Sequence, residues 1–188
     1  MATGELQAPE QASEQPQHFP QPRLPEGVTL RDARDEDAAE LIDLIGAVFA
    51  EYPGCVLDVD GELPELRAIA TSFQRWGGRF WVATREGRVL GCVGLTPSAA
   101  SPSEGIELRK LYVAKAARKM GLGSALCDLV EGAARALNKK FVELWSDTRF
   151  ENAHALYTRR GYTKGPETRD LHDKSASVEY SFKLDLQK

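Results

Sequence analysis

The sequence has few cysteines and no long apolar run. Its three cysteines, Cys55, Cys92 and Cys127, are odd in number, widely spaced and form no CxxC pair, which argues against a disulfide framework and a zinc site. No segment approaches the roughly 18 apolar residues of a membrane-spanning helix, and the N-terminus lacks a basic start followed by an apolar core. We therefore expect a cytoplasmic protein with no metal site and no membrane association.

An excess of basic residues is also missing, since the net charge is −4 over 188 residues. Nucleic acid is therefore not an expected partner, because phosphate binding needs clustered lysine and arginine. Residues 1–25 contain five prolines and five glutamines and almost no aliphatic side chains, so burial cannot offset the entropy of ordering them. We expect a disordered tail over residues 1–25, and one folded domain over residues 26–188 that begins near Val28.

The spacing of apolar residues predicts a mixed α/β domain in the order β-α-α-β-β-β-α-β-α-β-β. Glu86 and Gly87 are expected to join two strands as a hairpin, and Thr148 with Glu151 has the pattern of a capping box before a helix. The expected strands are 28–33, 79–85, 88–96, 106–113, 140–145, 162–164 and 177–186, and the expected helices are 37–52, 65–76, 122–137 and 151–160. Residues 165–176 are expected to form a polar loop between the last two strands.

A glycine-containing stretch, RKMGLG from Arg118 to Gly123, lies between a predicted strand and a predicted helix. The start of a helix carries free N–H groups, and glycine lets a ligand approach them, so the stretch suggests an anion site. It does not fit the phosphate-loop pattern GxxxxGK[ST], and it lacks the third glycine of the dinucleotide pattern GxGxxG. From the loop alone, an ordinary strand-to-helix turn remains an equal alternative.

Two motifs together resemble the GNAT superfamily of N-acetyltransferases. Arg118, Gly121 and Gly123 fill the family's loop pattern [Q/R]xxGx[G/A] after a strand ending in Leu111, Tyr112 and Val113. About 30 residues on, a pattern close to NxxAxxLYxxxG[F/Y] is matched by Ala153, Leu156, Tyr157, Gly161 and Tyr162. The resemblance covers Val28 to about Leu184. It departs from the family at Phe150, which stands where many relatives have an asparagine that contacts the pantetheine arm.

The resemblance implies direct transfer of an acetyl group from acetyl-CoA, as co-substrate, to a primary amine of a small molecule or protein. It implies a twisted sheet that opens between residues 108–113 and 140–145 to admit the coenzyme. The implied coenzyme-binding residues are Leu111, Tyr112, Val113, Arg118, Lys119, Met120, Gly121, Leu122, Gly123 and Ser124. In this reading the amides from Lys119 to Ser124 receive the pyrophosphate, and the Leu111 amide donates to the thioester oxygen.

Two residues are implied for catalysis. Glu107 matches a glutamate that acts as general base in one branch of the family, and a solvated carboxylate at the strand edge is the alternative. Tyr157 matches the tyrosine that returns a proton to the departing thiolate, and a phenol that stays protonated at neutral pH suits that task. The alternative for Tyr157 is a packed aromatic side chain.

The acceptor is less clearly indicated. The loop over residues 51–65 carries five carboxylates, which would suit a cationic amine, whereas Arg169 and His172 would suit a carboxylate and point towards amino acids. A coenzyme-binding sensor without turnover and an acyltransferase for longer acyl groups also remain alternatives. The oligomeric state is expected to be a monomer or a homodimer.

Overall fold

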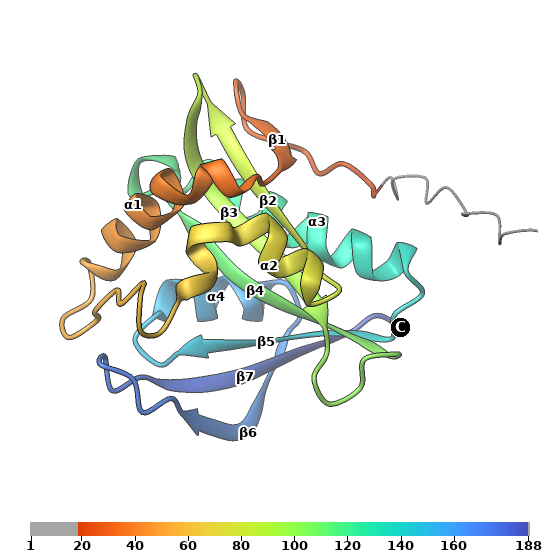
Figure 1. The fold of residues 1–188 in the computed structure, drawn as a ribbon. Coiled ribbons are helices and arrows are strands. Elements are labelled where there is room, and N and C mark those ends of the chain that lie inside the picture. The colour runs from red at the N-terminus through yellow and green to blue at the C-terminus, as the bar shows by residue number, and fades with distance from the viewer. Residues whose placement is uncertain (1–18, 188) are drawn as a thin grey trace, which may run out of the picture.

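The computed structural model describes residues 19–187. Their centre is one seven-stranded mixed sheet with the strand order β1-β2-β3-β4-β5-β7-β6 (Figure 1). The strands are β1 (Thr29–Asp32), β2 (Arg79–Arg85), β3 (Arg88–Pro97), β4 (Gly105–Val113), β5 (Phe141–Asp147), β6 (Thr163–Asp170) and β7 (Val178–Asp185). The α-helices are α1 (Ala38–Phe49), α2 (Ile69–Arg75), α3 (Leu122–Ala136) and α4 (Glu151–Arg159), with short 3-10 turns η1 (Asp35–Asp37), η2 (Pro64–Ala68) and η3 (Lys115–Ala117). The predicted fold class and element order are confirmed.

Helices cover both faces of the sheet. Helices α1 and α2 lie in front of it and α3 lies behind it in Figure 1. One apolar core joins α1, η2 and α2 to β2 and β3 around Leu41, Ile69 and Phe73. The other joins α3 and α4 to the central strands around Leu126, Leu144 and Tyr157. Burial on both faces fits the nearly continuous apolar sequences of β2 and β3.

The sheet opens between β4 and β5. These strands run parallel and are paired only from Gly105 to Glu107, opposite Phe141 to Glu143. Beyond that point β4 continues to Val113 and β5 to Asp147 without pairing to each other. The expected opening is therefore present, and one edge of β4 from Leu108 onwards has no described strand beside it.

Strand β4 contains a bulge at its middle. Lys110 has a φ of 53°, and the register between β3 and β4 shifts between Cys92 and Gly94. The extra residue shifts the alternation of side chains by one position, so that Leu108, Leu111 and Val113 pack on the α3 side. Tyr112 packs on the α1 side.

Three expectations about local structure are wrong. The last loop is shorter than predicted, because β6 continues to Asp170 and leaves only residues 171–177 as a connection. No capping box forms at Thr148, since α4 has Phe150 as its N-cap and no side-chain cap. The folded domain begins before Val28, because Phe19 is buried with its ring 6.0 Å from that of Trp81. The remaining residues of the predicted tail, 1–18, lie outside the described part of the chain.

Candidate active site

The glycine loop has the geometry of an anion-binding turn. Lys119 and Gly121 have positive φ angles of 62° and 88°, and α3 starts directly after Gly121. Within residues 19–187, none of the six amides from Lys119 to Ser124 donates a hydrogen bond to the protein. A Cβ added at Gly121 would meet no atom within 4 Å, so this side of the turn is open. Six free donors at the positive end of a 15-residue helix favour a multiply charged anion such as a diphosphate.

Arg118 supports the loop from its own side. Its guanidinium makes two hydrogen bonds to the Glu51 carboxylate, at 2.6 and 2.8 Å, and one to the Val113 carbonyl at 3.1 Å. The contact with Arg118 is the largest cause that lowers the pKa of Glu51. Arg118 therefore ties the loop to the end of α1 and to β4. Lys119 and Met120 are exposed, and Leu122 is buried beneath the turn.

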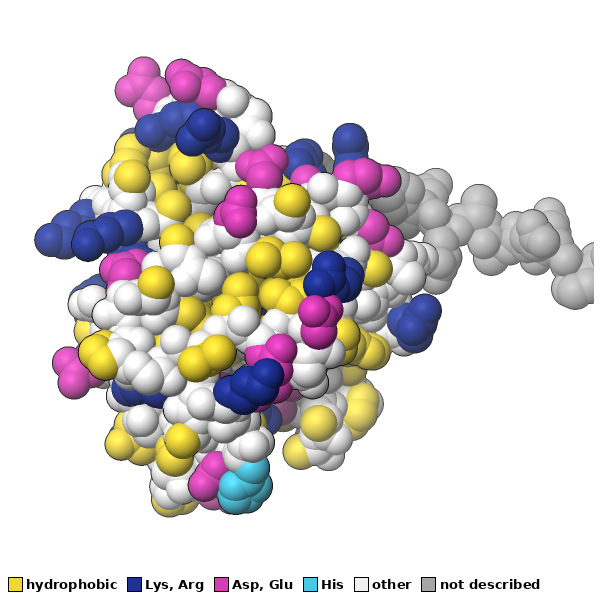
Figure 2. All heavy atoms as spheres, turned by 60° about the vertical axis from the view of Figure 1, so that its left-hand side comes forward, with side chains coloured by type: hydrophobic (Ala, Val, Ile, Leu, Met, Phe, Trp, Pro, Cys, Tyr) yellow, Lys and Arg dark blue, Asp and Glu magenta, His cyan; other side chains and the backbone are white. Residues whose placement is uncertain are grey.

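A cavity of about 530 Å³ lies on the α1 side of the opened strands. Figure 2 shows the side of the molecule that lies at the left of Figure 1, where hydrophobic side chains line a hollow and charged side chains surround it. Strands β4 and β5 supply its floor, and the α1–η2 segment and the β6–β7 loop supply its walls. Its charged lining residues are Glu62, Glu107, Arg109, Lys110, Asp147, Arg169, Asp173 and Glu179.

Glu107 faces this cavity from β4. Its side chain is 14% exposed, and burial raises the pKa of its carboxyl group, while Arg109 and Arg169 oppose that rise. The closest ion-pair contact is 3.8 Å, from Arg109 Nε to the carboxylate. A carboxylate with a raised pKa and no tight ion pair is a better proton acceptor than a fully paired one.

Tyr157 lies on the opposite side of the sheet from the cavity lining. It is 4% exposed, projects from α4 and packs near Tyr162 and Phe182 at ring distances of 5.7 and 5.6 Å. Burial raises the pKa of Tyr157 well above its usual value, and Cys127 and Tyr112 add to the rise. The phenol is therefore held in its protonated form at neutral pH.

Tyr112 and Phe150 line the cavity where β4 and β5 separate. The Phe150 ring lies 4.7 Å from that of Tyr52 and 6.1 Å from that of Phe49. The residue that replaces the family's asparagine thus joins an aromatic cluster with the end of α1. Burial raises the pKa of the Tyr112 phenol, so it too stays protonated.

Lys110, which lines the cavity, forms a buried ion pair with Glu65. The two charged groups are 2.7 Å apart, and the side chains are 10% and 11% exposed. Burial lowers the pKa of Lys110, and Glu65 opposes this effect. The pair connects η2 to the bulge of β4. The sequence carried one signal for the bulge: two polar residues separate Leu108 from Leu111, which breaks the alternation.

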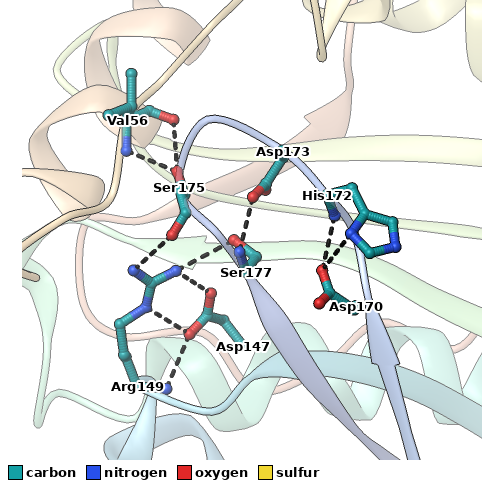
Figure 3. Close-up of polar contacts among 8 residues, drawn as sticks. All are labelled: Val56, Asp147, Arg149, Asp170, His172, Asp173, Ser175 and Ser177. Atoms are coloured by element: carbon teal, nitrogen blue, oxygen red, sulfur yellow. Dashed lines mark hydrogen bonds and ion pairs between the residues drawn. The ribbon is translucent and has the colours of Figure 1, made fainter.

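The β6–β7 loop is fixed over the cavity by a network centred on Arg149 (Figure 3). The guanidinium donates to the Asp147 carboxylate, to the Ser175 carbonyl at 3.2 Å and to the Ser177 hydroxyl at 3.1 Å. Burial alone would raise the pKa of Asp147, but the hydrogen bonds from Arg149 outweigh it and lower that pKa. No sequence motif pointed to this network, because its members come from three separate segments.

The structure separates the predicted site residues into two groups. Glu107 and Tyr112 face the cavity, whereas Leu111, Val113 and Tyr157 belong to the α3–α4 side of the sheet. The opening between β4 and β5 is the place where these two sides meet. Arg169 and His172 do line the cavity, as does Cys55. Among residues 19–187 no group of three or more metal-ligating side chains gathers, and no described helix is long and apolar enough to cross a membrane.

Comparison with known proteins gives relatives of similar sequence. A protein from Escherichia coli strain K12, the uncharacterized N-acetyltransferase YjgM, is 30% identical over 143 residues, which cover 73% of this chain and 83% of that protein. The probable N-acetyltransferase camello of Xenopus tropicalis is 35% identical over 85 residues, which cover 45% of this chain and 38% of that protein.

Solved structures share the fold. A GNAT-family acetyltransferase from Staphylococcus aureus Mu50 matches with a TM-score of 0.70 and 20% identity, over 85% of this chain and 99% of that one. YncA from Salmonella typhimurium, solved with its cofactor acetyl-CoA, matches with a TM-score of 0.66 and 19% identity, over 87% of this chain and 96% of that one. The sequence pattern of the acetyltransferase (GNAT) family matches residues 38–162. The match spans more than half of the chain, which therefore belongs to the acetyltransferase (GNAT) family.

Proposed function

We propose that the protein transfers an acetyl group from acetyl-CoA to the primary amine of an acceptor bound in the cavity beside Glu107. The observation that carries the proposal is the row of six free amides from Lys119 to Ser124 at the start of α3. A diphosphate is the part of coenzyme A that such a row suits. YncA, a structural neighbour, was solved with acetyl-CoA, which supports the same co-substrate.

The opened edge of β4 suits the rest of the coenzyme. From Leu108 to Val113 this edge has no described strand beside it, so its backbone groups, apart from the Val113 carbonyl that Arg118 binds, remain for an extended pantetheine arm. The Leu111 amide is the proposed donor to the thioester oxygen, where a hydrogen bond is worth most as negative charge develops. Acetyl-CoA supplies the acetyl group as a thioester, and the protein supplies binding, orientation and proton transfer.

Glu107 is the proposed general base. An amine with a pKa near 10.4 must lose its proton before it can attack, at a cost of about 4–5 kcal/mol at neutral pH. Burial raises the pKa of Glu107 towards the range in which it accepts a proton efficiently. The cavity position of Glu107 places its carboxylate where an acceptor amine is proposed to bind.

Tyr157 is the proposed general acid. Its buried phenol has a raised pKa and therefore carries a proton at neutral pH. The coenzyme thiolate, with a usual thiol pKa near 8.5, would take that proton as it leaves. Glu107 and Tyr157 lie on the two sides of the opening, which suits the two proposed proton transfers. Glu107 would take a proton from the attacking amine, and Tyr157 would give one to the departing thiolate.

Two measurements on the full chain test the proposal. Calorimetry with acetyl-CoA measures coenzyme binding, and an assay for free thiol against a broad panel of amines measures transfer. We expect binding and amine-dependent thiol release. Tight binding of acetyl-CoA without acetylation of any amine would instead support a coenzyme-binding sensor, and a preference for propionyl- or succinyl-CoA would redirect the proposal to a longer acyl group.

A further inference from the structure

The acidic loop that favoured a cationic acceptor has most of its charge paired within the protein. Each of its five carboxylates has a partner: Glu51 binds Arg118, Asp58 binds Lys174, Asp60 binds Arg67, Glu62 accepts the Lys174 amide and Glu65 binds Lys110. A carboxylate that holds an internal cation offers little attraction to a second one. Four of the five carboxylates of residues 51–65 are therefore already paired with a cation, and only Glu62 is not.

Two arginines that line the cavity keep hydrogen-bond donors that the protein leaves unused. Arg169 uses one nitrogen, Nε, to bind Glu179 at 2.5 Å, and the ion pair of Arg109 with Glu107 is long, at 3.8 Å. Within the described part of the chain the terminal guanidinium nitrogens of both arginines have no hydrogen-bond partner. Both side chains line the same cavity and remain partly exposed, at 35% and 42%.

Tryptophan rings hold these two guanidinium groups in place. The Arg169 guanidinium lies over the Trp145 ring at 4.6 Å, and that of Arg109 lies over the Trp76 ring at 5.2 Å. Stacking restricts the plane of a guanidinium while its edge remains available for bidentate bonds to a carboxylate. Two such groups near one carboxylate of raised pKa make a site with fixed donors and one proton acceptor.

The walls of the cavity restrict the size of the acceptor. Ser175 Oγ accepts the Val56 amide at 2.8 Å and donates to the Val56 carbonyl at 3.2 Å, as Figure 3 shows. The Lys174 amide donates to Glu62 at 2.6 Å, and its ammonium lies 2.6 Å from Asp58. These contacts join the β6–β7 loop to the segment after α1. A joined wall beside a cavity of about 530 Å³ favours a small molecule over the side chain of a folded protein.

We infer that the acceptor is a small amine that also carries a carboxylate, as an α-amino acid does, and that Arg109 and Arg169 bind this carboxylate while Glu107 faces the amine. The inference rests on the proposed function and names its substrate class.

The test compares each member of a panel of α-amino acids with its own carboxamide, which keeps the amine and the side chain and removes the negative charge. Calorimetry on the full chain measures binding, and thiol release from acetyl-CoA measures kcat/KM. We expect the acids to bind about 10-fold or more tightly than their amides, since hydrogen bonds to a charged partner are the stronger ones. The amine of an amide is less basic and more often neutral, so the kinetic comparison is biased against the inference.

Variants assign the effect to the two arginines. Arg109→Met and Arg169→Met should each weaken binding of the acids about 10-fold, mainly through KM, and leave the amides nearly unchanged. Arg135→Met, at an exposed position near the end of α3, is the matched loss of one charge and should change neither. Amides that bind as tightly as the acids, or arginine variants that weaken both classes equally, would overturn the inference. If the acids bind preferentially but no thiol is released, the inference stands and the proposed transfer fails.

Discussion

Replacing Gly121 with alanine tests the anion site at its most sensitive position. Gly121 has φ 88° and ψ −1°, a left-handed conformation that costs a residue with a Cβ about 1–2 kcal/mol. A Cβ there would meet no protein atom within 4 Å, so the chain should still fold. The same Cβ would occupy the open side of the turn, where the diphosphate is proposed to lie against the amides.

The expected loss of affinity follows from the bonds at stake. An amide that binds a charged oxygen contributes about 1.5–3 kcal/mol, and each 1.4 kcal/mol corresponds to a factor of ten in Kd. Losing one such bond should therefore raise the Kd for acetyl-CoA by roughly 10- to 100-fold. The loss of folding stability should stay near the 1–2 kcal/mol of backbone strain.

Gly87 provides the matched control. It has φ 79° in the β2–β3 turn, and an added Cβ there also meets no atom within 4 Å. Gly87→Ala should lose a similar amount of stability in chemical denaturation while its calorimetric Kd for acetyl-CoA stays at the wild-type value. If Gly121→Ala and Gly87→Ala bind acetyl-CoA equally well, the amides of the glycine loop do not hold the diphosphate, and the central argument for the coenzyme site is lost.

Three further variants test catalysis and stability. Tyr157→Phe should lower kcat by about 100-fold or more with little change in acetyl-CoA affinity, and unchanged turnover in the thiol-release assay would remove Tyr157 from the acid role. Glu107→Gln should lower kcat/KM by a similar factor and remove the acidic limb of its pH profile. Because the pKa of Glu107 is raised in the folded protein, the wild type loses stability as pH rises from the usual carboxyl pKa to the raised one. Compared with the wild type, Glu107→Gln should therefore be more stable above that window than below it in denaturation curves. An equal difference at both ends would contradict the assigned shift. Gly94→Ala should destabilise the fold by about 1–3 kcal/mol, because the new Cβ would lie 2.3 Å from the Phe73 ring and 2.6 Å from the Phe80 ring. An unchanged denaturation midpoint would show that the two rings can move to make room for it.

The elements that the sequence predicted well are those with a strong internal pattern. Helix α3 has a stripe of apolar residues at helical spacing, and the β2–β3 hairpin has its turn residues Glu86 and Gly87 between apolar strands. In both cases the local pattern and the tertiary packing agree. The missed extension of β6 differs because this edge strand is almost wholly exposed and carries Pro166 near an irregularity in its pairing with β7. Edge strands tolerate proline and need no alternation, so they leave little trace in a sequence.

Other parts depend on residues that are distant in sequence. The start of the domain depends on Phe19, whose burial requires Trp81 and whose ring also lies 5.2 Å below the Arg79 guanidinium. Composition alone predicted disorder there because the partners are about 60 residues away. The missing capping box is a similar case, because the N-cap position belongs to Phe150, which packs on Tyr52, and not to Thr148.

The same reason explains why sequence motifs pointed to a coenzyme loop but not to the site proposed for the acceptor. A loop that binds an anion through successive amides is contiguous, so its signature is contiguous as well. The cavity proposed for the acceptor is lined by Arg109 from β4 and Arg169 from β6, which are 60 positions apart in the chain. Strand β6 follows β4, β5 and β7 in the order of the sheet, so the two arginines come from strands on either side of β5 and β7. Arg169 lies opposite Glu179 of β7, which in turn lies opposite Asp147 of β5.

The bulge at Lys110 determines which side chains of β4 reach each side of the opening. Without the extra residue, strict alternation after Glu107 and Arg109 would turn Leu111 and Val113 towards the cavity and Tyr112 towards α3. The observed register instead keeps Leu111 and Val113 in the apolar core and leaves Glu107, Arg109 and Tyr112 together on the cavity side. The Lys110–Glu65 ion pair fills the position that the bulge creates. One inserted residue in β4 thus leaves the backbone edge of this strand for the proposed coenzyme and its polar side chains for the proposed acceptor.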